Sequence, residues 1–349
     1  MPKEAQFSIN FIRNIVYYSA GLGKDIVALC KEANFPPERL ATPDEMVSGA
    51  VVERVWQTAI ARVGDPELGL HIGEALQPTA LGLIGFVMLS CTTLGAALDK
   101  LARYWNLMSN ATSIRFRNDG RIAVLELVVH DLPGNFLLWN RHPVESSLSA
   151  ATGLTRALAG RQLPLSDAAS TYPLPVHTQE YERILGRLPR FNAEANLISF
   201  PAEALGWPIL HSNPGLLEQF EGQIRKRLEA DPSTNCDRVR TVLAKSLRGD
   251  VPDLTAVAKA LLMSERALQR ELQREGTTFR QVLDELRRDL AVEYLRDFRQ
   301  HSTTDISFLL GFSEPSVLHR YFRRWMGMTP QEYRRLNCLG AAVPEHEPT

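Results

Sequence analysis

The 349-residue sequence predicts an α+β domain followed by an all-α C-terminal domain with two helix-turn-helix units joined by a connecting helix. Three observations predict this fold. The first two hundred or so residues contain both helical periodicity and short strand-like runs, whereas no strand candidate follows residue 250. Near the C-terminus, two segments about fifty residues apart repeat one helix–turn–helix pattern. At about 150 residues per domain, the length agrees with two domains.

Composition places the chain among ordinary globular proteins, with 44% hydrophobic and 23% charged residues. Although 39 Lys and Arg balance 40 Asp and Glu overall, residues 255–335 hold 14 basic against 11 acidic residues, nearly all of the basic ones Arg. Such an excess favours contact with phosphates or bases. The four cysteines lie far apart without metal-ligand spacing, so we expect reduced thiols, no metal and no cofactor. The start of the chain lacks the layout of a signal peptide, which favours the cytoplasm.

The elements of the first part follow from periodicity and turn signals. Residues 8–76 have helical patterns, and Asn118-Asp119-Gly120 predicts a tight turn between two strands. The uncharged stretch 75–98 could span a bilayer, but its glycines, proline and hydroxyl residues predict a buried helix pair, with Thr92 or Thr93 capping the second helix. The remaining expectations are strands at 112–118, 121–130 and 196–200, and helices at 136–159 (closed by Gly160), 178–185 and 216–230.

The two C-terminal repeats, residues 254–272 and 305–322, each combine a short helix, a tight turn and a second helix. Ser264 is suited to cap the second helix of the first unit, and Gly311 supplies a permissive turn in the second. Apolar residues four apart on each second helix face the core. The opposite faces carry residue types that bind base edges or phosphates in a major groove, and the predicted DNA contacts are Ser264, Arg266, Gln269, Arg270, Arg274, Ser316, His319, Arg320, Arg323 and Arg324.

An apolar stripe from Phe279 to about residue 299 predicts a rigid helix between the two units. If the units enter successive major grooves on one face of a duplex, this helix must hold them ~34 Å apart. Arg323 and Arg324 could clamp phosphates or simply solubilise the surface.

The string GFSEPSVLHRYFRRWMGMTPQEYR, residues 311–334, resembles the signature of the AraC/XylS family of bacterial transcription regulators. Residues 263–272 and 276–279 resemble that family's first helix-turn-helix unit. Residues 64–74, 81–86, 94–98 and 191–200 resemble the effector-type N-terminal domain of one branch of the family. Leu262 stands where the family usually has Gly, so we expect a slightly reshaped turn. Pro315 and Ser316 offer few hydrogen bonds, so the second unit is expected to act mainly through Arg320 and backbone contacts.

The resemblance implies a sequence-specific DNA-binding regulator, more often an activator that recruits RNA polymerase than a repressor. It also implies an effector-binding or dimerising sensor domain at residues 1–205, a linker helix and linker at 206–245, a DNA-binding domain at 246–337 and a disordered tail at 338–349. No GxSxG, HExxH or complete P-loop occurs, and no cysteine has the zinc-binding or reactive context of DNA alkyl-repair enzymes. We therefore do not expect an enzyme.

Arg141 and His142 fall in the third turn of the otherwise apolar helix predicted at 136–159. With Trp105 they are our candidate ligand residues, and they favour a small organic acid or a fatty acyl effector. The alternative is a ligand-independent regulator whose N-terminal domain only forms a homodimer or binds a protein partner. Tight packing around Leu81–Leu89 would leave no cavity, whereas a sensor needs a pocket of ~300 Å³ or more.

Overall fold

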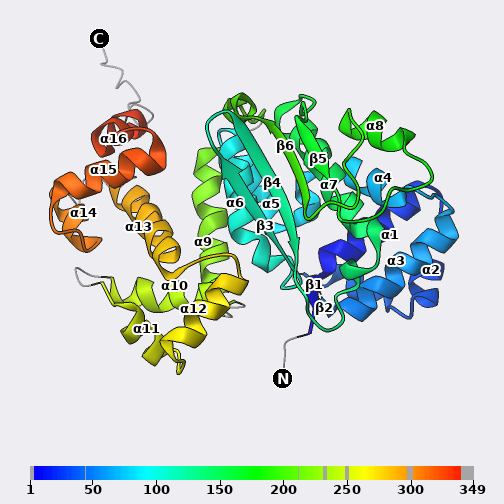
Figure 1. Cartoon of the computed structure of the whole chain (residues 1–349), viewed down its shortest axis with the longest axis horizontal. Coiled ribbons are helices and arrows are strands. Elements are labelled where there is room, and N and C mark those ends of the chain that lie inside the picture. Colours follow the sequence, from blue (N-terminus) through cyan, green and yellow to red (C-terminus); the bar gives the residue numbers. More distant parts are fainter. Residues whose placement is uncertain are drawn as a thin grey trace, which may run out of the picture. The chain divides into compact units, whose positions relative to one another are not determined.

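The computed structural model describes residues 4–43, 45–210, 212–230, 234–247, 251–296 and 302–338. The chain divides into two compact parts, an N-terminal domain (Met1–Arg227) and a C-terminal domain (Leu228–Thr349), each with its own hydrophobic core. Figure 1 gives the order of the elements along the chain. The predicted tail lies outside the described residues except for Cys338.

The N-terminal domain begins with helices around a two-stranded sheet. Strand β1 (Gln6–Ser8) pairs antiparallel with β2 (Met46–Ser48), a pairing that the helical periodicity of this region did not predict. The Ser8 hydroxyl caps the helix that follows β1 by accepting from the Asn10 N–H. The other elements are α1 (Ile9–Gly21), α2 (Ile26–Glu32), the 3₁₀ helix η1 (Pro37–Ala41), α3 (Gly49–Val63), α4 (Leu68–Glu74), η2 (Pro78–Leu81), α5 (Leu83–Ser90), α6 (Leu94–Tyr104) and η3 (Trp105–Leu107).

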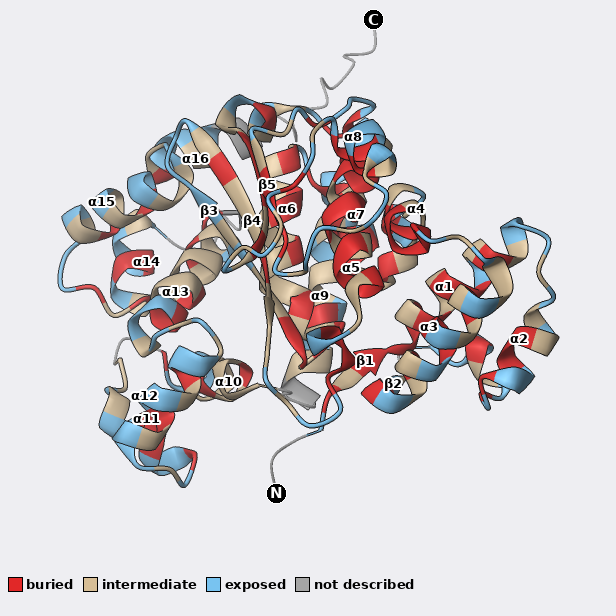
Figure 2. Ribbon diagram, turned by 45° about the vertical axis from the view of Figure 1, so that its right-hand side comes forward, coloured by how far each residue is buried: buried red, intermediate tan, exposed pale blue. Residues whose placement is uncertain are grey.

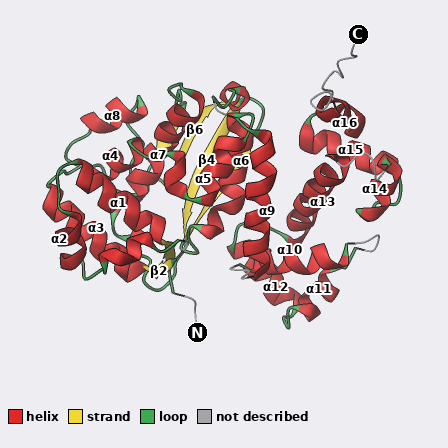
Figure 3. Cartoon of the chain, turned by 180° about the vertical axis from the view of Figure 1, so that it is seen from behind, coloured by secondary structure: helices red, strands yellow, loops and turns green. Residues whose placement is uncertain are grey.

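A four-stranded antiparallel sheet in the order β3-β4-β6-β5 forms the second half of this domain. The predicted hairpin is confirmed, with Asp119 accepting from the backbone of Arg121 and Ile122 in the turn. Helices α5, α6 and α7 lie over one face of the sheet, as Figure 3 shows from behind. The elements are β3 (Thr112–Asn118), β4 (Ile122–Val129), η4 (Phe136–Leu138), α7 (Arg141–Ala159), β5 (Asp167–Ala169), α8 (Gln179–Leu185), β6 (Asn196–Pro201) and η5 (Ala202–Gly206).

The helix predicted at 136–159 is shorter than expected. Residues 136–138 form a 3₁₀ turn, and α7 starts at Arg141 with the Asn140 side chain accepting from the His142 N–H as its cap. Gly160, with φ of 66°, ends the helix as predicted. In Figure 2, α7 is coloured as buried along most of its length.

The uncharged stretch forms η2, α5 and the start of α6, and Thr93 caps α6 by accepting from the Ala96 N–H. Side chains of α5 such as Ile84, Val87 and Met88 are fully buried, as expected for a buried helix pair. Within the described ranges, none of the helices combines the length and apolar character that a bilayer crossing requires.

Residues 206–245, expected to be a linker, are divided between the two domains. Helix α9 (Pro214–Ala230) packs on the N-terminal domain, where Phe220 stacks on Phe86 and Tyr104 donates to Glu221 at 2.9 Å. The next helix, α10 (Asn235–Ser246), is part of the C-terminal core, because Val239 and Leu243 are fully buried there. Residues 231–233, in the stretch with linker composition, lie outside the described part.

The C-terminal domain is all helical over its described residues, as predicted. Two helix-turn-helix units, α11–α12 and α14–α15, are joined by the long helix α13. The helices that follow α10 are α11 (Leu254–Ala260), α12 (Glu265–Arg274), α13 (Phe279–Arg296), α14 (Thr303–Leu309), α15 (Pro315–Met326) and α16 (Pro330–Cys338).

Candidate functional site

Helix α12 separates a core face from an exposed polar face. Leu268 and Leu272, four residues apart, are fully buried against the C-terminal core. Ser264 caps the helix, its hydroxyl accepting from the Ala267 N–H at 3.2 Å. The predicted DNA contacts Ser264, Arg266, Gln269, Arg270 and Arg274 are all exposed, so one helix presents them together.

The turn before α12 keeps the left-handed conformation despite its leucine. Leu262 has φ of 57°, and its N–H donates to the Lys259 carbonyl while the Met263 N–H donates to that of Ala258. In the second unit, Gly311 has φ of 68° and occupies the same position in the same pair of bonds. Our expectation of a reshaped turn is therefore wrong. The leucine adopts the glycine conformation because its side chain is 95% exposed and meets no neighbour that prevents it.

Helix α15 repeats this design. Pro315 is its first residue as predicted, and Leu318 and Phe322 are fully buried. Its exposed residues include the predicted contacts Ser316, Arg320, Arg323 and Arg324, while His319 is half-buried.

Three of the predicted arginines have partners within the domain, and the first is Arg270, whose Nε lies 3.6 Å from the Glu271 carboxylate. The Arg324 guanidinium lies 3.6 Å from the Asp284 carboxylate of α13 and over the Tyr321 ring. Arg274 donates to Glu271 at 3.1 Å on its own helix. All three side chains remain mostly exposed, and a phosphate can compete for them because exposed ion pairs contribute little stability.

Arg287 of α13 fixes the second unit to the connecting helix. Its Nε donates to the Leu310 carbonyl at 2.9 Å and a terminal nitrogen donates to that of Gly311 at 3.1 Å. The guanidinium also lies 4.4 Å from the centre of the Phe312 ring. No local sequence signal indicates this role, because the arginine and the turn that it holds are more than twenty residues apart.

Glu275 has the corresponding role after the first unit. Its carboxylate accepts from the backbone N–H groups of Asn235 and Cys236, both at 2.8 Å, at the start of α10. Carboxylates at a helix N-terminus are favoured by the helix dipole and by the unpaired N–H groups there. Specific polar contacts thus attach the first helix-turn-helix unit to α10 and the second to α13.

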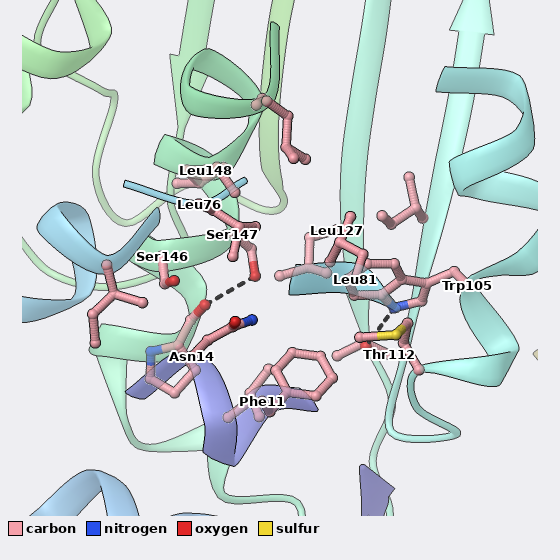
Figure 4. A pocket seen from close by; sticks show the side chains of 18 of the residues that line it. Phe11, Asn14, Leu76, Leu81, Trp105, Thr112, Leu127, Ser146, Ser147 and Leu148 are labelled. Atoms are coloured by element: carbon pink, nitrogen blue, oxygen red, sulfur yellow. Dashed lines mark hydrogen bonds between the residues drawn. The ribbon is translucent and has the colours of Figure 1, made fainter. Parts of the chain in front are cut away.

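A cavity of about 110 Å³ lies in the core of the N-terminal domain, between the four-stranded sheet and helices α1, α3, α6 and α7 (Figure 4). Its lining is mainly apolar. Among its polar residues, Thr112 accepts from the Trp105 indole at 2.8 Å and Ser147 donates to the Pro143 carbonyl at 2.9 Å. A cavity therefore remains beside Leu81, although its volume is below the ~300 Å³ of a typical ligand pocket.

Of the three candidate ligand residues, Trp105 lines this cavity, whereas Arg141 and His142 do not. An acidic effector held by these two residues would therefore have to bind outside this cavity. Because α7 begins at Arg141, its cavity-facing positions lie further along. They are Pro143, Ser146, Ser147, Ala150, Ala151 and Leu154.

Arg141 and His142 are instead committed to structural contacts. Arg141 donates to Glu145 at 2.9 Å and to the Pro66 carbonyl at 2.6 Å. His142 stacks on Trp56, and its Nδ1 accepts from the Gly69 N–H at 3.3 Å. Burial, with the nearby charge of Arg141, lowers the pKa of His142 to about 4. The imidazole is therefore neutral at physiological pH and cannot attract a carboxylate.

Two parts of the chain each match a known protein family. Residues 23–209 match the family described as the arabinose-binding domain of AraC transcription regulator, N-term, and residues 257–336 match a helix-turn-helix domain family. The Ornithine utilization regulator of Pseudomonas aeruginosa is 32% identical, covering 88% of this chain and 90% of that protein. VirS, an HTH-type transcriptional regulator of Mycobacterium tuberculosis, is 26% identical over 90% of this chain and 92% of its own. The solved structure of the regulator CdpR from P. aeruginosa covers 93% of this chain and 98% of its own, with 23% identity and a TM-score of 0.44.

Proposed function

The chain belongs to the AraC family of DNA-binding transcription regulators, a family of regulators rather than enzymes, and we propose that a small effector bound in its N-terminal domain controls its affinity for a promoter operator. We further propose that it acts as an activator that recruits RNA polymerase, works as a homodimer, and resides in the cytoplasm with the bacterial DNA.

One observation carries the DNA-binding part of this proposal. Helices α12 and α15 each bury two apolar residues and expose, on the opposite face, residue types that bind base edges and phosphates. In our proposal Arg266, Gln269 and Arg270 contact bases in one half-site, and Arg320 contacts bases in the other. The remaining predicted residues position the domain on the phosphates. Each good bidentate base contact is worth ~1–3 kcal/mol of discrimination.

The test is selection of bound sequences from a randomised duplex pool by the full chain at several salt concentrations. We expect a motif of two blocks about one helical turn apart. Arg270→Ala should relax the preference within one block and Arg320→Ala within the other. Arg121→Ala, which removes an equal charge from the exposed hairpin turn of the N-terminal domain, is the matched control. Absence of an enriched motif, or unchanged base preferences in both variants, would refute these assignments.

Effector control is supported by the cavity, which lies in the domain that matches an arabinose-binding family. Its small volume of about 110 Å³ is the observation that favours the second candidate, a ligand-independent regulator whose N-terminal domain only dimerises or binds a protein. Operator affinity measured with and without added small molecules separates the two candidates, because the second one predicts no change with any of them.

A further inference from the structure

The described residues that line the cavity place no charged group in its interior. Glu126 of β4 is the charged residue of that lining, but side chains alternate between the two faces of a strand. Its neighbours Leu125 and Leu127 pack toward the core, and its carboxylate accepts from Arg115 at 3.3 Å and Arg117 at 2.9 Å. An ionised group inside this cavity would therefore be buried without a partner, which is strongly unfavourable.

Two polar side chains of the lining, Asn14 and Ser146, have no hydrogen-bond partner among the described residues, and Asn14 is the one that carries an amide. Asn14 of α1 follows Phe11 by one helical turn, and both line the cavity. Figure 4 shows the Asn14 side chain extending toward the middle of the space. Thr112 and Ser147 already have partners, whereas the Asn14 amide makes no hydrogen bond to any residue that the structure describes. An amide offers both donors and an acceptor, so Asn14 can recognise a neutral polar group of either kind.

The volume limits the size of the occupant. At about 110 Å³ the cavity is somewhat smaller than an engineered apolar cavity of ~150 Å³ that binds benzene. The side chains around it include Trp105, Leu148 and Leu154, whose contacts favour an apolar body. A short alkyl chain of a few carbons fits this space. A ring as large as benzene needs more room, and a sugar ring would also leave several hydroxyls without partners.

We propose that this cavity binds a small neutral molecule with a short alkyl chain and a single amide, alcohol or ester group that Asn14 hydrogen-bonds. The inference rests on the proposed effector control and names the chemical class of the effector. It replaces the acidic effector that Arg141 and His142 favoured at the sequence level.

The test compares matched neutral and charged probes with the full chain. Propanamide and butanamide are titrated beside propanoate and butanoate by calorimetry near pH 7.5, and the fluorescence of Trp56 and Trp105 provides a second readout from the lining itself. We expect each amide to bind at least about ten-fold more tightly than its carboxylate, because the carboxylate would lose its hydration without gaining a partner.

Two variants locate the binding. Asn14→Leu should weaken butanamide binding by about ten-fold, the usual worth of one hydrogen bond in a complex. Ala151→Leu, which fills the cavity, should abolish binding of both amides. Ala157→Leu is its matched control, because Ala157 lies on the same helix outside the lining. Thermal unfolding identifies any variant that fails to fold. If one of Asn14→Leu and Ala151→Leu does not fold, binding by the other one decides whether the ligand occupies this cavity.

Carboxylates that bind as tightly as their amides would overturn the proposal, as would the absence of binding by either amide. Amide binding that Ala151→Leu leaves unchanged would also overturn it, because the ligand would then lie elsewhere. DNA selection with the same preparations keeps this test separate from the proposed function. An enriched operator motif without amide binding refutes the ligand class and leaves the DNA-binding function standing.

Discussion

Leu262 provides the sharpest test of the turn geometry in the first helix-turn-helix unit. Its backbone is left-handed, with φ of 57°, where the second unit has Gly311 at φ of 68°. Non-glycine residues pay ~1–2 kcal/mol for this conformation. Since the leucine side chain is 95% exposed, it gains almost nothing from burial in return. We therefore expect Leu262→Gly to stabilise the C-terminal domain, although most substitutions destabilise.

The magnitude follows from two opposing effects. Relief of the backbone conformation contributes ~1–2 kcal/mol in favour of glycine. The greater freedom of glycine in the unfolded chain costs ~0.5–1 kcal/mol. The expected net gain is about 0.5–1 kcal/mol, which raises the melting temperature of this domain by roughly 2–6 °C.

The measurement is urea and thermal unfolding of the full chain, with the C-terminal transition followed by hydrogen exchange of residues 251–296. Gly311→Ala is the converse control, and we expect it to destabilise by about 1 kcal/mol because alanine must adopt the left-handed conformation. If Leu262→Gly is neutral or destabilising while Gly311→Ala behaves as expected, then the leucine is held by an interaction that this reasoning omits, and the strain argument is refuted.

Two other predictions concern buried polar groups. Arg287→Ala should cost the second helix-turn-helix unit about 2–4 kcal/mol, because two carbonyls lose a charged donor, and Arg287→Lys should recover only part of this since lysine lacks the planar fork. Equal hydrogen-exchange protection of residues 302–326 in the wild type and the alanine variant would contradict this. Burial lowers the pKa of His142 to about 4, so the unfolded chain takes up the proton first on acidification and stability is lost as pH falls below about 6.5. The free energy of unfolding of the N-terminal domain should therefore fall by about 2 kcal/mol between pH 7 and pH 5, and the His142→Gln variant should lack this decrease. Parallel pH profiles of the two proteins in urea unfolding would exclude this role.

The sequence determined the features that depend on neighbouring residues. The cap at Ser264, the buried pair Leu268 and Leu272, and the turn at Gly311 each rest on contacts within a few positions of the chain. Caps, helical periodicity and left-handed turn positions are decided by such local interactions. The same reasoning located the β-hairpin and the buried helices around Thr93, and the repetition of the local pattern indicated the DNA-reading faces.

Local rules failed where a boundary depended on packing. Extending the helix back to Phe136 placed Arg141 inside the predicted helix and not at the start of α7, and two side chains with structural contacts were interpreted as ligand contacts. Packing also decided which domain each helix of the expected linker joins. Helices α9 and α10 have ordinary amphipathic patterns, and only the partners of Phe220 and Val239 assign one to each domain.

Only the tertiary structure shows the cavity and the long-range contacts that hold the two helix-turn-helix units in place. The cavity lining runs from Phe7 to Ile198, and Asn14 becomes a candidate ligand contact only because residues more than a hundred positions away leave space beside it. Arg287 and Glu275 likewise gain their roles from carbonyls and N–H groups on other helices. Periodicity and capping report which face of an element is apolar, but a void or a long-range hydrogen bond arises only when faces from distant segments are brought together.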